Sequence, residues 1–279
     1  MIPLTVIGGF LGAGKTTLIN FLLRTATERL GVLVNDFGAI NIDAALIQAR
    51  DGDLVALTNG CVCCEIGGDL GGGLARLTSV DHVIVEASGV SDPWRVAQLA
   101  LVEPGFHLEP IVVLVDGLSI ATQLADRWVA DTVRGQLAAA ELIVLNKADT
   151  DVILPAHVPV IKTLFGAVPM AALRFPVPPR SRFRGDIPSA EKFRSLLVTP
   201  SGPFDRGRLR ACLTALPRSV LRVKGFCRLG ATAEPHLLQF ASGQWSLTPS
   251  ASQPPGLVVI GTPDMPEDAD VRDLFNSLR

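Results

Sequence analysis

Short apolar, β-branched runs recur through the first half of the chain. Most of them are continuously apolar rather than alternating, which is typical of strands buried on both faces of a parallel sheet. Residues 16–30 instead repeat apolar positions at helical spacing, which predicts an amphipathic helix. The order strand, helix, strand predicts an α/β domain with a three-layer, mostly parallel sheet that binds ligands at the carboxyl ends of its strands. The expected strands are residues 4–7, 32–34, 82–85, 111–115 and 142–145.

The pattern changes after residue 173. Residues 174–188 are rich in proline and arginine without sustained periodicity, which predicts a linker. Beyond it we expect a helix over residues 205–216 and three strands, over residues 220–229, 237–240 and 257–260. The sequence therefore predicts a larger domain over residues 1–173 and a second, smaller α+β domain over residues 189–279.

A glycine-rich loop follows the first predicted strand. The run Gly9-Phe-Leu-Gly-Ala-Gly-Lys-Thr16 fits the phosphate-binding pattern Gly-x-x-x-x-Gly-Lys-Ser/Thr, between a strand and a helix. Glycines let the backbone curl so that its N–H groups face phosphates. Lys15 is expected to contact the β- and γ-phosphates, and the Thr16 hydroxyl is expected to bind Mg²⁺. The expected phosphate-binding residues are Gly9, Gly12, Ala13, Gly14, Lys15, Thr16 and Thr17.

The run Asn146-Lys147-Ala-Asp149 directly follows the predicted strand 142–145. Its position at a strand end places it on the rim where a nucleotide would lie. The Asp149 carboxylate can accept both the N1–H and the N2–H of guanine, a pair of donors that adenine does not offer. In a chain that also carries a phosphate loop, this motif predicts GTP rather than ATP.

Three carboxylates and one glycine are candidates for a nucleotide-sensing switch. Glu86 ends the predicted strand 82–85 and is expected to hold the Mg²⁺ shell, while the Gly89 N–H senses the γ-phosphate. The same segment also fits a helix N-cap at Ser91 or Asp92, and both interpretations can hold together. Asp36 and Asp43 follow the second strand and are candidates for orienting the attacking water or holding the Mg²⁺ shell, although loop carboxylates are more often simply solvated.

Three cysteines fall within four residues, at Cys61, Cys63 and Cys64. Thiolates at this density suit Zn²⁺, Cu⁺ or Co²⁺, and three protein ligands with one open position are typical of a site that releases its metal. The alternative is a set of buried or redox-sensitive thiols. Cys212 and Cys227 lie far away in sequence, where buried apolar cysteines are expected.

Charge and composition narrow the partners. The 279 residues carry 25 Lys and Arg against 27 Asp and Glu, a formal charge of −2. This balance gives no reason to expect nucleic acid or a membrane as a general partner. The first residues lack a basic segment ahead of the apolar stretch, and Lys15 interrupts that stretch early, so we expect a cytoplasmic protein.

Taken together and in order, these motifs resemble those of the CobW-like P-loop GTPases. The resemblance rests on the phosphate loop, Asn35-Asp-Phe-Gly38, Gly60-Cys-Val-Cys-Cys64, Glu86-Ala-Ser-Gly89 and Asn146-Lys-Ala-Asp149, and it extends over residues 1 to about 165. Residues 216–225 are similar to the start of that family's carboxyl-terminal domain. The resemblance implies a GTPase that binds zinc or cobalt at Cys-x-Cys-Cys and delivers it to a recipient metalloprotein or cofactor-synthesis enzyme.

Two departures from the family pattern limit what is carried over. The family's switch usually has glutamate where this chain has Asp36, which is one methylene shorter. No histidine-rich stretch is present, so we expect about one ion at a defined site. The alternatives are a small-molecule kinase or ATPase and a non-catalytic metal-binding scaffold. The sequence leaves open the native metal, the recipient, the fourth metal ligand, the role of the second domain and whether a homodimer forms.

Overall fold

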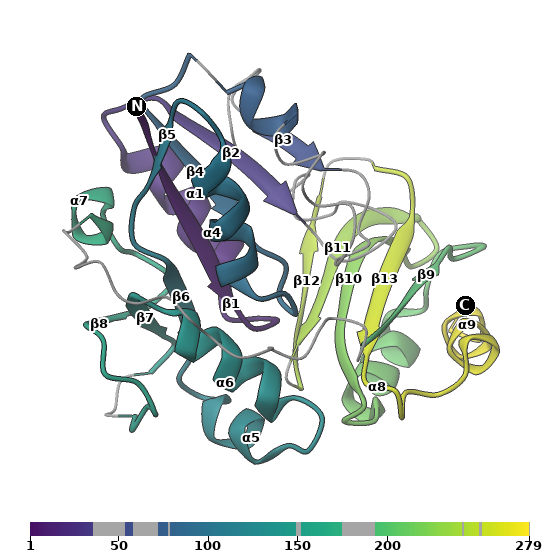
Figure 1. Ribbon diagram of the computed structural model, residues 1–279. Coiled ribbons are helices and arrows are strands. Elements are labelled where there is room, and N and C mark those ends of the chain that lie inside the picture. Colours follow the sequence, from purple (N-terminus) through teal and green to yellow (C-terminus); the bar gives the residue numbers. More distant parts are fainter. Residues whose placement is uncertain are drawn as a thin grey trace. The chain divides into compact units, whose positions relative to one another are not determined.

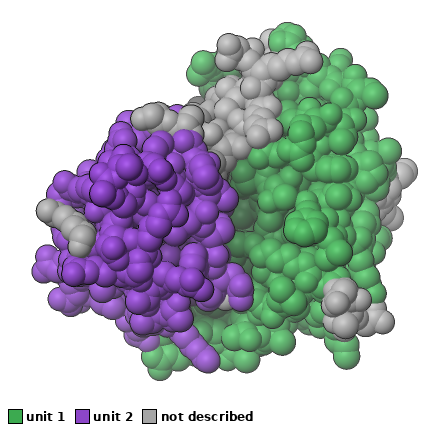
Figure 2. Space-filling model, turned by 180° about the vertical axis from the view of Figure 1, so that it is seen from behind, with its two compact units in different colours: residues 1–37, 43–191 green, residues 38–42, 192–279 purple. Residues whose placement is uncertain are grey.

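The structure is a computed structural model that describes residues 1–35, 54–57, 72–77, 79–148, 152–174, 193–241, 243–250 and 253–278. The chain divides into two compact units, coloured separately in Figure 2. The described residues up to 174 belong to the first unit, and those from 193 onward belong to the second.

The first unit is built around a parallel sheet of eight strands (Figure 1). Seven strands run in the order β3-β2-β4-β1-β6-β7-β8, and β5 also pairs with β1. All described pairings in this sheet are parallel. The strands are β1 (Ile2–Gly9), β2 (Leu30–Asn35), β3 (Leu54–Leu57), β4 (His82–Glu86), β5 (Phe106–Leu108), β6 (Val112–Asp116), β7 (Leu142–Asn146) and β8 (Val160–Thr163).

Helices cover both faces of this sheet. On one face, α1 (Lys15–Thr25) and α7 (Met170–Leu173) share a core with alternate residues of the central strands. On the other, α4 (Pro93–Val102) contacts β1 and β5, and α6 (Ala130–Ala139) contacts β1 and β6 beside α5 (Ile120–Ala125). The predicted three-layer α/β fold and all five predicted strands are confirmed.

The chain passes from β1 to one side of the sheet for β2 to β4 and to the other side for β6 to β8. In open parallel sheets, ligands bind outside the carboxyl ends of the strands where the strand order reverses. The carboxyl end of β1, where the glycine-rich loop begins, is this point in the first unit.

The predicted end of the first helix was wrong, because α1 ends at Thr25 rather than at residue 30. Ala26 is extended, with ψ 139°, and Leu30 begins β2. Between them the Arg29 N–H donates to Asp81 Oδ2 at 2.9 Å, and the Arg29 guanidinium donates to the carbonyl of Ser79 at 3.1 Å. These long-range bonds fix an extended entry into β2 that local propensity does not reveal.

The second unit is an antiparallel sheet in the order β12-β11-β10-β13-β9, with two helices on one face. Leu209 and Leu213 of α8 and Val271 and Phe275 of α9 pack on that face in a single core. This is the smaller α+β domain that the sequence predicted. Its elements are β9 (Arg194–Val198), α8 (Arg206–Ala215), β10 (Val220–Leu229), β11 (Glu234–Ala241), β12 (Gln244–Pro249), β13 (Gly256–Gly261) and α9 (Asp268–Asn276).

Candidate functional site

The glycine-rich loop turns sharply between β1 and α1. Gly9, Gly12 and Gly14 all have positive φ, at 132°, 82° and 106°. Side chains are excluded there as well, because a Cβ at Gly9 would overlap the backbone oxygen of Leu114 and one at Gly14 would lie 2.5 Å from Nδ2 of Asn146. Conformation therefore requires glycine at all three positions, and space requires it at Gly9 and Gly14 as well.

Lys15 opens α1, and its side chain folds back over the loop. Its Nζ donates to the carbonyl oxygen of Gly9 at 3.0 Å, and the residue is buried. A buried ammonium at the start of a helix adds its charge to the positive end of the helix dipole. The loop therefore concentrates positive potential where phosphates would lie. Of its other predicted ligands, Ala13 is buried, Thr16 is partly buried and Thr17 is exposed.

Asn146, the first residue of the predicted guanine-binding motif, contacts the phosphate loop across 133 positions of sequence. Its Nδ2 donates to the carbonyl of Ala13 at 2.9 Å, and its Oδ1 accepts from the N–H of Gly166 at 3.1 Å. The side chain is buried with both ends bonded. It therefore holds the phosphate loop and the turn after β8 in fixed relation.

Lys147 makes a second bridge to the same loop. It has positive φ, 62°, directly after β7, and its Nζ donates to the carbonyl of Gly12 at 2.7 Å. Nζ also lies 2.7 Å from Oδ2 of Asp116, a buried carboxylate at the end of β6. Asp116 is a site residue that the sequence reasoning missed. The sequence feature that could have indicated it is an acidic residue followed by a glycine, Gly117, at the carboxyl end of β6.

Glu86 lies at the end of β4 and faces Thr16. The Thr16 hydroxyl donates to Glu86 Oε1 at 3.5 Å, and Glu86 is buried. A hydroxyl and a carboxylate beside a phosphate loop form an oxygen donor set of the kind that Mg²⁺ takes together with substrate phosphates. The donor chemistry at this position therefore fits the predicted magnesium ion.

The segment after β4 also caps a helix. Asp92 Oδ1 accepts from the N–H of Trp94 at 2.9 Å, with Pro93 as the first residue of α4. The helix is drawn tightly against the sheet, since a Cβ at Gly8 would lie 2.8 Å from the Pro93 ring. The alternative interpretation of this segment as an N-cap at Asp92 is thus correct, and it coexists with Glu86 on the rim.

Gly89 is held from two sides. A Cβ at Gly89 would overlap the Leu11 side chain of the phosphate loop, so the two segments touch closely. On its carbonyl side, Nε2 of the buried Gln136 donates to Gly89 O at 3.2 Å and to Ser91 O at 3.0 Å. Gln136 lies on α6, and no motif or periodicity in the sequence indicates this role.

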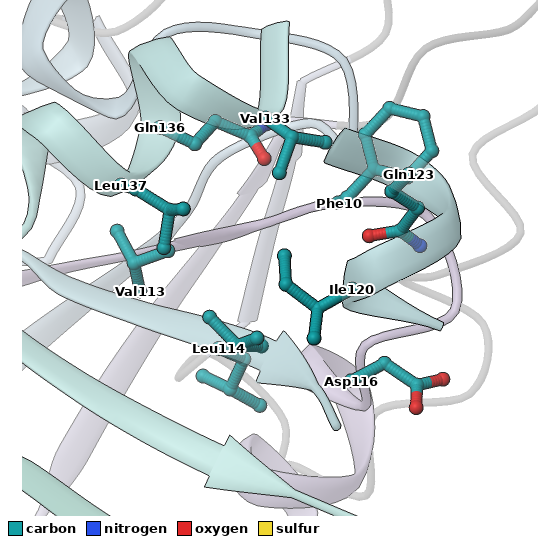
Figure 3. A pocket seen from close by; sticks show the side chains of 10 residues that line it. Phe10, Val113, Leu114, Asp116, Ile120, Gln123, Val133, Gln136 and Leu137 are labelled. Carbon is teal, nitrogen blue, oxygen red and sulfur yellow. The ribbon is translucent and has the colours of Figure 1, made fainter. Parts of the chain in front are cut away.

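A small pocket lies beside the phosphate loop and is lined in part by Gln136 (Figure 3). It lies between β6 and the helices α5 and α6. Phe10 of the phosphate loop stands beside Gln123 at one side, and apolar residues line most of the rest (Figure 3). Gln123 itself donates to Ser119 Oγ at 2.9 Å. Phe10 of the phosphate loop, Asp116 and Gln136 therefore all line the same pocket.

The remaining predicted site residues lie outside the described residues. They are Asp36, Asp43, Cys61, Cys63, Cys64 and Asp149. Within the part of the chain that the structure describes, no group of three His, Cys, Asp or Glu side chains is placed to hold a metal ion. The same part contains no helix that is both long and apolar enough to span a membrane.

The cysteines of the second unit have structural surroundings. Cys227 is buried in the core of that unit, and burial raises the pKa of its thiol to about 12. Cys212 is partly buried against the same core, and burial also raises its pKa. Thiols held protonated in apolar surroundings are poor metal ligands and poor nucleophiles.

His82 forms a buried network at the amino end of β4, at the end of the sheet opposite to the phosphate loop. Its Nε2 lies 2.8 Å from Thr5 Oγ1, while Nδ1 contacts the guanidinium of Arg174, which also pairs with Glu28 at 2.8 Å. Arginine only donates, so Nδ1 accepts and Nε2 carries the proton. Burial, then the charge of Arg174, then His107 lower the pKa of His82 to about 3.

Comparison with known proteins gives two family matches that together cover most of the chain. The model of the CobW/HypB/UreG nucleotide-binding domain matches residues 3–157, and that of the cobalamin synthesis protein CobW C-terminal domain matches residues 193–279. Residues 158–192 lie between the two matches.

Individual relatives are similar over part of their length. The zinc chaperone CobW of Sinorhizobium sp is 34% identical over 182 residues, which span 53% of this chain and 51% of that protein. The zinc-regulated GTPase metalloprotein activator 1 of Dictyostelium discoideum is 30% identical over 193 residues, spanning 53% of this chain and 40% of that protein. The chain thus spans about half the length, or less, of these curated relatives.

A crystal structure of the Zn(II)-bound YjiA GTPase from E. coli aligns over 100% of this chain and 99% of that one, with 20% identity and a TM-score of 0.44. The match to the nucleotide-binding family model extends over more than half of the chain. The protein therefore belongs to the CobW/HypB/UreG family.

Proposed function

We propose that the chain binds GTP with Mg²⁺, hydrolyses it to GDP and phosphate, and uses this cycle to handle a transition-metal ion. One observation carries the nucleotide part of this proposal. The side chains of Asn146 and Lys147 donate hydrogen bonds to the carbonyls of Ala13 and Gly12, and these bonds join the proposed guanine motif to the phosphate loop. The family membership and the name of the Dictyostelium relative support the same function.

Base selection is assigned to Asp149. It stands two positions beyond Lys147, and its carboxylate would accept the two N–H groups of guanine. A site built around that pair would leave a desolvated charge unpaired with adenine, which is a large penalty. The rival function of an ATPase or small-molecule kinase is distinguished by comparing GTP with ATP. Asp149→Asn should weaken GTP binding selectively.

The described residues have separate roles in the proposed reaction. Lys15 would neutralise charge on the β- and γ-phosphates from the start of α1, and Thr16 with Glu86 would hold the magnesium ion. When bound, that ion would offset the negative charge of the transferred phosphoryl group. The Gly89 N–H would contact the γ-phosphate, and Asp36 or Asp43 would orient the attacking water.

Zinc is the proposed cargo. The curated relatives are named as a zinc chaperone and as a zinc-regulated activator of metalloproteins, which favours zinc over cobalt for this chain. We assign its binding to the thiolates of Cys61, Cys63 and Cys64, and its destination to a recipient metalloprotein. Zinc is commonly bound by cysteine thiolates in this number.

The two halves of the proposal are linked by differential affinity. The γ-phosphate favours one arrangement of the segments near Glu86 and Gly89, and the cysteines lie between the second and fourth strands in sequence. A ligand shifts such an equilibrium only if it binds the two states differently, and the coupling is reciprocal. Zinc should therefore bind more tightly with a GTP analogue than with GDP, and zinc should tighten GTP by the same factor.

The test measures phosphate release and zinc affinity on the full chain. Lys15→Ala should abolish GTP hydrolysis, whereas Lys162→Ala, on the edge strand β8, should leave it unchanged. Serine at positions 61, 63 and 64 should remove zinc binding and retain GTP binding. Equal zinc affinity with GTP analogue and GDP would contradict the coupling and favour a metal-binding scaffold, and hydrolysis that survives Lys15→Ala would contradict the phosphate-loop assignment.

A further inference from the structure

Phe165 occupies an unusual position in the turn that follows β8. The N–H of Ala167 donates to the carbonyl of Leu164 at 3.3 Å, and the two central residues, Phe165 and Gly166, both have positive φ, at 57° and 64°. Positive φ at both central positions is the pattern of a type I′ turn, which favours Asn, Asp or Gly there. A phenylalanine at the first of them is strained. Phe165 is nevertheless 83% exposed, so burial does not explain it either.

The turn is anchored beside the phosphate loop. The N–H of Gly166 donates to Oδ1 of Asn146, the residue that also bonds Ala13. A Cβ at Gly166 would lie 3.0 Å from the backbone nitrogen of Leu18, in the early part of α1. Phe165 therefore projects from a fixed backbone on the rim where the nucleotide would bind. Strained and rigidly held residues of this kind cluster at ligand sites.

A second exposed apolar side chain lies on the other side of Lys147. Leu118 follows β6, is 72% exposed and is fixed through its N–H, which donates to Asp116 Oδ1 at 3.0 Å. Because β7 lies between β6 and β8 and all three are parallel, Leu118, Lys147 and Phe165 stand at the same edge of the sheet. This rim thus carries exposed apolar side chains on either side of Lys147, with Leu118 on one side and Leu164 and Phe165 on the other. Such an arrangement suits a flat, aromatic ligand with polar edges.

We propose that Phe165 is the aromatic surface on which the purine ring of the nucleotide stacks. This inference rests on the proposed function and adds a specific affinity determinant to it. Base–aromatic stacking accepts any purine, because every base has a π-face. Phe165 therefore contributes affinity for the base without selecting guanine, and selection remains with Asp149. The anchored turn holds the ring in place before the ligand arrives, which limits the entropy lost on binding.

The test separates the ring from the backbone of the turn. Phe165→Asn introduces a residue that the turn prefers, so it should raise the melting temperature while removing the ring. Phe165→Ala removes the ring alone, and Phe165→Trp restores an aromatic face. Calorimetric titration of the full chain with GTP should show a Kd at least about fivefold higher for the Asn and Ala variants, with Trp close to wild type.

Inorganic tripolyphosphate is the matched probe, because it has the phosphates but no base. Its Kd should be unchanged in all three variants. Val160 is an exposed apolar residue at the amino end of β8, the strand that precedes the turn. Val160→Ala should change neither the GTP affinity nor the tripolyphosphate affinity. Unchanged GTP affinity in Phe165→Asn, or a parallel loss of GTP and tripolyphosphate affinity, would overturn the inference. A wild-type chain that prefers ATP would contradict the proposed GTP function while leaving the stacking role intact.

Discussion

The Nζ atom of Lys147 lies 2.7 Å from Oδ2 of Asp116 and 2.7 Å from the carbonyl oxygen of Gly12. One ammonium thus ties together the ends of β6 and β7 and the phosphate loop. The Asp116 carboxylate is buried, and its second oxygen is also used, because Oδ1 accepts from the N–H of Leu118. The position of Lys147 over the loop depends on this carboxylate.

Replacing Asp116 should therefore weaken nucleotide binding without touching the nucleotide. Asp116→Asn keeps an acceptor for Leu118 and loses the charge, so we expect the Kd for GTP to rise about threefold to tenfold, the ion pair being partly exposed to water. Asp116→Ala loses both contacts and should bind more weakly still. Calorimetric titration measures both, and equal affinity in wild type and Asp116→Ala would contradict this role.

The local motifs made much of the nucleotide site predictable. The phosphate loop and the run from Asn146 are each contiguous in sequence, and each follows an apolar strand, which is enough to place both on one rim of a parallel sheet. Asp116 was missed because its partner is 31 positions away and a lone acidic residue at a strand end often has no functional role. Gln136 was missed for a similar reason, since its acceptors are the distant backbone carbonyls of Gly89 and Ser91.

Three elements of the second unit, β9, β12 and α9, were not predicted, and β12 and α9 carry weak periodic signals. β12 is an edge strand with only two apolar side chains on its core face, Trp245 and Leu247, and both are only partly buried. α9 buries only Val271 and Phe275, one pair at helical spacing amid acidic residues. α9 is stabilised by contacts with β9, which is distant in sequence. β12 is stabilised by its pairing with β11. Strands buried on both faces, such as β7, were predicted because burial makes nearly every residue of the strand apolar.

Gln136 should affect both stability and turnover. Gln136→Leu leaves two buried carbonyls without their donor, so the free energy of unfolding should fall by about 3 kcal/mol, measured by urea denaturation. The released Gly89 segment should also lower kcat for GTP. Gln136→Glu should be similarly unstable at neutral pH and regain stability as pH falls, because only the protonated carboxyl can donate to a carbonyl.

Gln123→Leu is the matched control for this prediction. It removes a buried glutamine from the same pocket, but one bonded to Ser119 rather than to the Gly89 segment. It should lower stability and leave kcat near the wild-type value at temperatures where the variant is folded. Equal effects of the two leucine variants on kcat would mean that Gln136 acts only through general stability.

His82 should make stability depend on pH in a defined window. Its pKa is lowered from 6.5 to about 3 in the folded chain, so between these values the unfolded chain binds more protons than the folded one. The free energy of unfolding therefore falls as pH is lowered through this range, by up to about 1.4 kcal/mol per pH unit from this group. The contribution is fully present above pH 6.5 and is lost as pH approaches 3.

The measurement is urea denaturation at several pH values from about 5 to about 7, above the range where most carboxylates titrate. His82→Gln retains a donor for Thr5 and an acceptor for Arg174 but cannot titrate, so its stability should change less steeply with pH than that of the wild type. The two curves should converge toward lower pH, because only the wild type loses stability by protonation. Burial and the adjacent Arg174 guanidinium are the two largest causes of the low pKa of His82, so its protonation should oppose folding. Parallel curves for the wild type and His82→Gln would contradict this role.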